Sequence, residues 1–209
     1  MTYVKASVRR PAGNPGNGIQ PKDQLVIYDV DDILSFPQRN DAGVVIEDDI
    51  VMKAGRYAIG IYLTPGTAEI SSNSDGETDA EGYTPSVKFN HPGNEQEIRE
   101  FKTNWLSKKC IVVLRYCSGK PADLIGTPCN PCKLSVSYTG SNESNTNELT
   151  FTQISKGDDI AIYRGTDTLE EPVAVVEAGA TDIDYQTDGQ YQLSAGAAKI
   201  AGVTGGSHG

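Results

Sequence analysis

Residues 94–107, NEQEIREFKTNWLS, form the one clear helical pattern in a chain that otherwise consists of short strand-like segments and turns. One face of this predicted helix is apolar and carries Ile98, Phe101, Trp105 and Leu106. Asn94 can cap the first turn, and Glu97 follows three residues later, as in a capping box. Because an amphipathic helix must bury its apolar face, we expect a mainly β protein against which this helix packs.

Length and composition favour one β-rich core. The chain has 209 residues, of which 37% are hydrophobic and 7% aromatic, with 22 Gly and 11 Pro. Domains commonly run to about 100–200 residues, so one core is the simplest expectation. Many turn formers suit strands joined by turns and long loops better than a helical bundle.

Two segments show the strand pattern most clearly. Residues 110–117, CIVVLRYC, are nearly continuous in apolar and β-branched side chains, which is typical of a central, buried strand. Residues 56–63 alternate, and the side chains expected on one face are Tyr57, Ile59, Ile61 and Leu63. Shorter strands are expected at 25–30, 44–46, 50–52, 87–89, 134–138, 149–152, 160–163, 173–176 and 191–193.

The pattern divides the chain into three parts. Residues 1–23 are polar and rich in turn formers, and we interpret them as an extended N-terminal arm. Residues 24–166 form the β domain, in which 71–82 (SSNSDGETDAEG) is expected to be a flexible hairpin tip or a long surface loop and 140–147 a polar loop. Residues 167–209 form a C-terminal extension that ends in a mobile Gly/Ala-rich tail.

The charge of the chain argues against a tight nucleic-acid binder. Its formal net charge is −10, and its Lys and Arg residues do not gather into one stripe. An acidic protein can still lie beside DNA without adhering to it, because like charges repel. The N-terminus lacks the apolar run of a secretory signal, and no stretch approaches a membrane span, so we expect synthesis and retention in the cytoplasm.

The cysteines form one motif that could bind a metal. Cys129 and Cys132 have the CxxC spacing of redox pairs and of half a zinc site, and Cys110 and Cys117 could complete the site. Pro128 and the following strand do not suit a redox motif, and the spacing from 110 to 117 is not that of a zinc knuckle. We expect reduced thiols in a turn or the core, and keep metal ligation by Cys129 and Cys132 as an alternative.

Other candidate sites have simpler explanations. Acidic clusters lie at 29–32, 47–49 and 75–81; the last lacks the glycine and distal glutamate of a calcium loop, and we expect all three to be solvated loops. His91 precedes a Pro-Gly turn and His208 lies in the tail, and neither is placed like a catalytic base. We therefore expect no enzyme, no catalytic residue and no cofactor.

Three short patterns along the chain occur in a familiar order. They are DILSFP at 32–37, EIREF and NWL within 97–106, and LTFT with a later AIYRG within 149–165. Together they resemble the tail tube, or major tail, proteins of tailed bacteriophages and related prophages, in particular those of Bacteroidetes-type hosts. The resemblance covers about residues 20–166.

The resemblance implies a β-sandwich or barrel with one flanking helix, at about 94–107, that assembles into stacked hexameric rings. The inner strands of six subunits would form a continuous β-barrel channel through which genomic DNA passes without specific binding. The protein would be made in the host cytoplasm and reside in the virion tail with other tail proteins. Contacts between rings would involve the N-terminal arm and the 71–82 loop, in particular Ser72, Asp75, Gly76, Glu77 and Asp79.

Strand pairing and net charge are both consistent with assembly into rings. Open edge strands are a liability unless they are paired, and ring closure removes them. Six copies of a −10 subunit give a negative assembly, and DNA would be repelled from the wall if enough of that charge faced the channel.

Two alternatives to a tail tube remain open at this stage. One is another phage structural protein, for head decoration or tail completion, that forms fixed oligomers. The other is a ligand-binding β-sandwich module, which would need an exposed aromatic platform made from side chains such as Tyr57, Tyr62, Tyr83, Tyr116 and Trp105.

Overall fold

The computed structural model describes residues 6–13, 16–117 and 119–169, together with the backbone of 183–185 and 191–193. The chain divides into two compact units, Met1–Glu170 and Glu171–Gly209. In the second unit β13 (Ile183–Tyr185) and β14 (Tyr191–Leu193) pair in an antiparallel hairpin, and β14 coincides with a predicted strand. The predicted strand at 173–176 and the tail at 194–209 lie outside the described residues.

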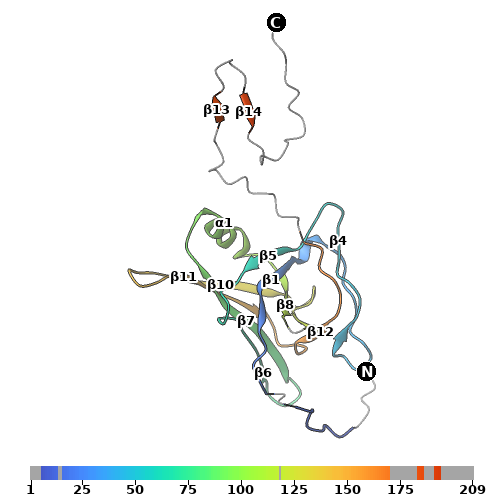
Figure 1. Cartoon of the computed structure of the whole chain (residues 1–209). Helices are drawn as coiled ribbons and strands as arrows, with labels where there is room; N and C mark the ends of the chain where they lie inside the picture. Colours follow the sequence, from blue (N-terminus) through green and yellow to red (C-terminus); the bar gives the residue numbers. More distant parts are fainter. Residues whose placement is uncertain (1–5, 14–15, 118, 170–182, 186–190, 194–209) are drawn as a thin grey trace. The chain divides into compact units, whose positions relative to one another are not determined.

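The first unit is mainly β with one α-helix in its described part, as predicted (Figure 1). A 3-10 turn, Val30–Asp32, follows the first strand. The elements are β1 (Pro21–Asp29), β2 (Ile33–Ser35), β3 (Val45–Ile46), β4 (Val51–Met52), β5 (Ile59–Tyr62), β6 (Glu69–Asp75), β7 (Gly82–Pro92), α1 (Gln96–Trp105), β8 (Cys110–Tyr116), β9 (Ala122–Ile125), β10 (Cys132–Gly140), β11 (Asn145–Gln153) and β12 (Ala161–Tyr163).

Ten of these strands form one hydrogen-bonded sheet that folds into two layers. The first layer has the order β5-β1-β8-β9-β12-β3, and the second has the order β10-β11-β7-β6. All neighbouring strands are antiparallel except the short β12–β3 pair. The layers are joined where Cys132 of β10 pairs with Cys110 of β8. Beyond that pair the two layers separate and enclose a core.

Two apolar cores explain why the strands of the first layer are so hydrophobic. The core between the layers contains Leu25 and Ile27 of β1, Phe89 of β7 and Phe151 of β11, and the two phenylalanine rings stack 6.3 Å apart. The opposite face of the first layer is covered by the chain between β1 and β5, which forms a second core. β1 and β8 are therefore buried on both faces, which confirms the prediction of a central strand at 110–117.

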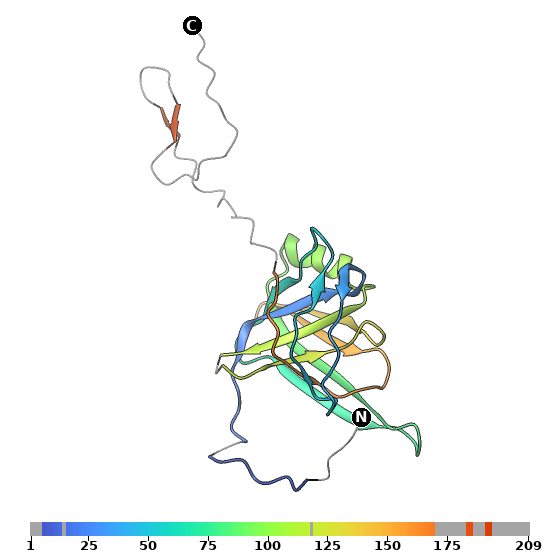
Figure 2. The same cartoon turned by 90° about the vertical axis from the view of Figure 1, so that its right-hand side faces the viewer.

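Helix α1 covers the end of the sandwich away from the β6–β7 turn (Figure 1, Figure 2). Ile98 is buried, and Phe101 stacks on Trp105 at the margin of the inter-layer core. The predicted apolar face is wrong at Leu106, which is 54% exposed because the helix ends at Trp105.

The predicted cap is also wrong. The N-cap residue is Glu95, without a side-chain cap bond, and Asn94 does not cap the helix. The amide oxygen of Asn94 instead accepts a hydrogen bond from Lys102 Nζ at 2.8 Å, and the same ammonium donates to the buried Asn147 of β11 at 2.6 Å. A tertiary contact between helix and sheet thus replaces the local cap.

Polar strands account for the other differences from the predicted pattern. β6 extends to Asp75, so only 76–81 forms the turn expected at 71–82, and the β10–β11 turn spans only 141–144. Asparagine and aspartate are depleted in strands, but pairing in register with a neighbouring strand overrides this preference. The β domain also extends slightly beyond its predicted boundaries at residues 24 and 166. At its start, β1 begins at Pro21, and at its end Thr168 O accepts a hydrogen bond from Ala58 N at 3.0 Å.

No helix in the described part of the chain is long and apolar enough to cross a membrane.

Candidate functional site

The outer face of the second layer carries a regular array of polar side chains. Along β11, Asn147, Leu149 and Phe151 face the core, so the residues between them face outward. The same alternation holds in β10, β7 and β6. The outward side chains are Lys133, Ser135, Ser137 and Thr139 (β10), Thr146, Glu148, Thr150 and Thr152 (β11), Thr84, Ser86, Lys88 and Asn90 (β7), and Glu69, Ser71, Asn73 and Asp75 (β6).

Cross-strand contacts order this face. The hydroxyl groups of Ser71 and Ser86 lie 3.0 Å apart, and Lys88 Nζ lies 3.5 Å from the carboxylate of Glu69. A shallow depression of about 240 Å³ lies around Glu148 and is lined by side chains of β10 and β11, their turn and Asn90. We define these outward residues of β10, β11, β7 and β6 as the hydroxyl face.

The second layer also has two open edges. Among the described residues, β6 pairs with β7 alone, and β10 pairs with β11 and, at one position only, with β8. Successive residues of an antiparallel strand bond opposite neighbours. Next to the end of β7, Gly93 N donates to Asn145 O. By this alternation, the backbone groups of odd-numbered residues of β7 are hydrogen-bonded to β11, and those of even-numbered residues are hydrogen-bonded to β6. In β6 the residues left facing the open edge are Ile70, Ser72 and Ser74.

The same reasoning identifies the edge groups of β10. Ile154 N donates to Pro131 O at 3.0 Å, so odd-numbered residues of this strand bond β11. The backbone groups of Leu134, Val136 and Tyr138 therefore face away from β11. Both edges expose donors and acceptors of the kind that pair with another strand.

The five residues predicted for contacts between subunits lie along β6 and its turn. Ser72 is not in the turn but in the middle of β6, where its hydroxyl donates to the Asp159 carboxylate. Asp75 accepts hydrogen bonds from Lys156 and from the N–H of Gly76, and these bonds lower the pKa of its carboxyl group.

The β6–β7 turn has a backbone that only certain residues tolerate. Gly76 has φ of 143°, and a Cβ there would lie 2.3 Å from Ala80 O, so glycine is required. Asp79 adopts φ of 70°, and Glu77 beside it is exposed. At the base of the turn Tyr83 exchanges both backbone hydrogen bonds with Gly157. The acidic tip is thus a defined projection at one end of the second layer.

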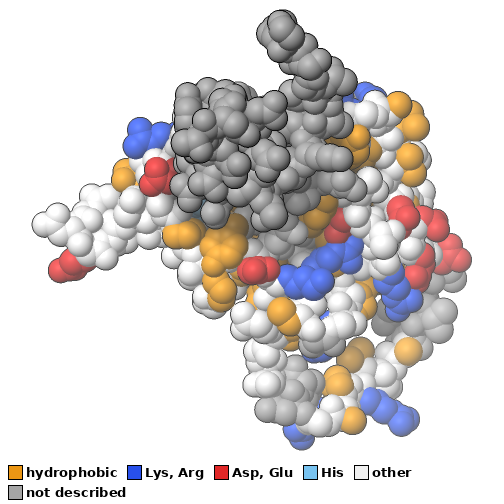
Figure 3. Space-filling model, turned by 45° about the horizontal axis from the view of Figure 1, so that its top comes forward, with side chains coloured by type: hydrophobic (Ala, Val, Ile, Leu, Met, Phe, Trp, Pro, Cys, Tyr) orange, Lys and Arg blue, Asp and Glu red, His pale blue; other side chains and the backbone are white. Residues whose placement is uncertain are grey.

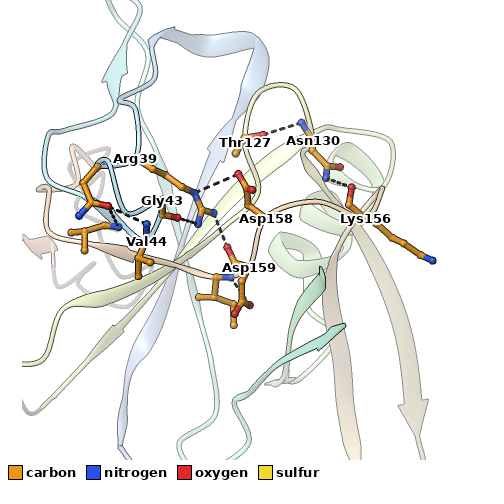
Figure 4. Close-up of polar contacts among 11 residues, drawn as sticks. Arg39, Gly43, Val44, Thr127, Asn130, Lys156, Asp158 and Asp159 are labelled. Carbon is orange, nitrogen blue, oxygen red and sulfur yellow. Dashed lines mark hydrogen bonds and ion pairs between the residues drawn. The ribbon is translucent and has the colours of Figure 1, made fainter. Parts of the chain in front are cut away.

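Arg39 joins two loops beside this projection (Figure 4). Its guanidinium donates to Gly43 O at 3.0 Å and to Asp159 O at 2.6 Å, and its Nε lies 3.8 Å from the Asp158 carboxylate. Depressions of about 360 and 310 Å³ lie on either side of Arg39. The residues labelled in Figure 4 do not pair a nucleophile with a base, so this cluster holds the loops together.

The structure separates the cysteines that were considered as metal ligands. Cys129 and Cys117 are exposed, whereas Cys132 and Cys110 are buried where the two layers join. Within the described ranges no group of three or more His, Cys, Asp or Glu side chains could hold a metal ion. Burial raises the pKa of the Cys110 thiol to about 12 and raises that of Cys132 further, so both remain protonated at neutral pH.

This placement predicts the thiol chemistry of the native protein. Cys117 and Cys129 should react quickly with a chromogenic disulfide reagent such as DTNB, because thiolate attack requires access. Cys110 and Cys132 should react only after unfolding in guanidinium chloride. A count of released thiolate against time tests this, and rapid reaction of three or four thiols would mean that the junction between the layers is open.

The aromatic side chains proposed for a ligand platform do not come together. Tyr57 precedes β5 and Tyr62 ends it, whereas Tyr83 lies at the start of β7; all three are exposed, and the Tyr62 ring packs edge-on against His91. Trp105 instead stacks on Phe101. On the face drawn in Figure 3, hydrophobic side chains form separate patches between charged ones.

The hydroxyl face and the strands that form the open edges are candidate functional features that sequence reasoning did not identify. A signal was present in the alternating Ser and Thr residues of 133–139 and 146–152, but the strand order that brings these segments together depends on long-range pairing. Comparison with known proteins adds nothing to this geometry: no protein family, no curated protein and no solved structure matches the chain.

Proposed function

We propose that this protein is a virion structural protein that polymerises into the tail tube of a bacteriophage, as stacked and hexameric rings through which DNA passes. The observation that carries the proposal is the second layer, a four-stranded antiparallel sheet with one buried face, one polar face and two open edges. A protein whose only task is to present a binding site would be expected to cover such edges.

The strand directions of the second layer suit ring closure. Four antiparallel strands place β10 and β6 in opposite directions at the two edges. When a copy is rotated about an axis along the strands, its β10 keeps its direction and meets β6 of the first copy as an antiparallel partner. This contact is heterologous, because two different edges meet, and a heterologous contact forms a ring when the rotation between successive copies closes.

Ring closure would form a barrel in which the hydroxyl face lines the channel and the first layer lies outside. The β6–β7 turn projects from one end of such a ring, where it can reach the next ring. We assign Ser72 to the junction within a ring, and Asp75, Gly76, Glu77 and Asp79 to contacts between rings. Other tail proteins would bind at the tube ends.

The turn can be tested separately from ring closure. Replacing residues 76–81 by the two-residue turn Asn-Gly joins Asp75 to Gly82, which are already a cross-strand pair. We expect this variant to form rings that do not stack, because the edges are intact and the projection is gone. Negative-stain microscopy distinguishes rings from tubes, and tubes of normal length would contradict the assignment.

The proposal as a whole is tested by assembly. Light scattering at low protein concentration and negative-stain microscopy at raised concentration should show small species that grow into tubes of uniform width with a central channel. A protein that remains monomeric under both conditions would contradict the proposal. Fixed oligomers that never extend would favour a head-decoration or tail-completion protein.

A further inference from the structure

Together with Lys156, which pairs with its member Asp75, the hydroxyl face carries no net charge, although the whole chain is strongly acidic. Its charged members are Lys88, Lys133, Glu69, Glu148 and Asp75, and Lys156 Nζ lies 3.2 Å from the Asp75 carboxylate, so three positive and three negative charges cancel. Lys88 and Glu69 also form a cross-strand ion pair at 3.5 Å. Every other member of the face is Ser, Thr or Asn.

The acidic residues of the described chain lie mainly on loops and ends. Exposed carboxylates gather at residues 47–49, at the 75–81 turn, at the first turns of α1 and at 158–159. Of these groups only Asp75 lies on the hydroxyl face, where it pairs with Lys156, and the other carboxylates of that face are Glu69 and Glu148. The formal charge of −10 therefore does not describe the surface that the proposed ring turns inward.

We propose that the wall of the channel is electrically balanced and hydroxyl-lined, so that DNA passes without either ionic attraction or ionic repulsion. This inference rests on the proposed tube and concerns the interaction of its wall with a nucleic-acid duplex. It replaces the expectation, drawn from composition, that an acidic wall repels DNA.

The physical consequence is a weak dependence on salt. A wall with net positive charge would release counterions on DNA contact, and its affinity would fall steeply as salt rises. A wall with net negative charge would exclude DNA at low salt and admit it once the charges are screened. Hydroxyl and amide groups hydrogen-bond water or phosphate equally in either condition, so a balanced wall gives neither trend.

The experiment measures how a short fluorescent DNA duplex partitions between pelleted tubes and solution as salt is varied from about 50 to about 200 mM. A duplex blocked at both ends by a bound protein cannot enter and reports adhesion to the outside. Wild-type tubes should take up the open duplex with no change across this range after the outside signal is subtracted.

Two matched variants make the wall charged in opposite senses. Glu69→Gln with Glu148→Gln should retain DNA at least tenfold more at the low-salt end and lose this retention as salt rises. Lys88→Gln with Lys133→Gln should exclude DNA at low salt and admit it at high salt. All four side chains are at least partly exposed at the sheet surface, and Lys88 and Glu69 are 44% and 68% exposed, so these exchanges should not unfold the subunit.

The outcomes distinguish a failure of the balanced-wall inference from a failure of the proposed tube function. Uptake by wild-type tubes that rises or falls steeply with salt would overturn the balanced wall. Variants that leave the salt dependence unchanged would also overturn it, because the hydroxyl face would then not line the channel. Microscopy of the same samples reports the other failure: if no tubes form, the proposed function itself is contradicted.

Discussion

Replacing Ser72 by proline is expected to abolish ring and tube formation while the subunit remains folded. The N–H of Ser72 faces the open edge of β6, so its loss does not break the ladder with β7. In the proposed ring that N–H pairs with β10 of the neighbouring copy. An acceptor left without a donor in a buried junction costs about 1–3 kcal/mol, which weakens association up to about a hundredfold at every junction.

A matched variant isolates the backbone effect. Ser72→Ala removes the same hydroxyl bond to Asp159 but keeps the N–H, so it should assemble like the wild type. Sedimentation velocity and negative-stain microscopy of both variants give the comparison, and circular dichroism confirms that each is folded. Normal tubes from Ser72→Pro would show that β6 does not form the junction.

Replacing Asp167 by asparagine is expected to give the largest loss of stability. The Asp167 side chain is 6% exposed, forms an ion pair with Arg115 and accepts a hydrogen bond from Tyr28 at 2.6 Å. Burial and the nearby carboxylate raise the pKa of Tyr28, so its phenol stays protonated and donates. Removing one partner leaves the Arg115 charge uncompensated, and breaking a buried pair costs about 3–5 kcal/mol.

An exposed ion pair provides the control for this change. Glu47 pairs with Arg164 at 2.9 Å, but both side chains are more than half exposed. Glu47→Gln should therefore cost less than about 1 kcal/mol. Urea unfolding of the two variants gives both values. Equal and small losses would mean that Asp167 does not anchor the end of the β domain.

The sequence predicts those parts of the fold that depend on local pattern and two-sided burial. The segment 110–117 is correct because a strand covered on both faces has few positions left for polar residues. The helix is correct in place but not at its start, because Asn94 bonds Lys102 and, through it, β11. Local capping rules cannot anticipate a contact with a strand that follows 45 residues later.

The candidate site depends more heavily on contacts that are distant in sequence. β6 is rich in Ser, Asn and Asp and is a strand only because it pairs with β7. The ion pair between Arg115 and Asp167 joins positions 52 residues apart, and it places Asp167 in the β domain, beyond the predicted boundary at residue 166. Neither the open edges nor the charge balance of the hydroxyl face can be deduced before the strand order is known.

Electron cryomicroscopy of the assembled protein is the measurement that tests the central claim most directly. The account predicts a closed ring in which β6 of each copy is hydrogen-bonded, antiparallel, to β10 of the next, with the hydroxyl face lining the channel. A ring or tube joined through other elements, such as β5 or the separate two-stranded sheet of β2 and β4, would contradict it, and so would a protein that forms no ring at all.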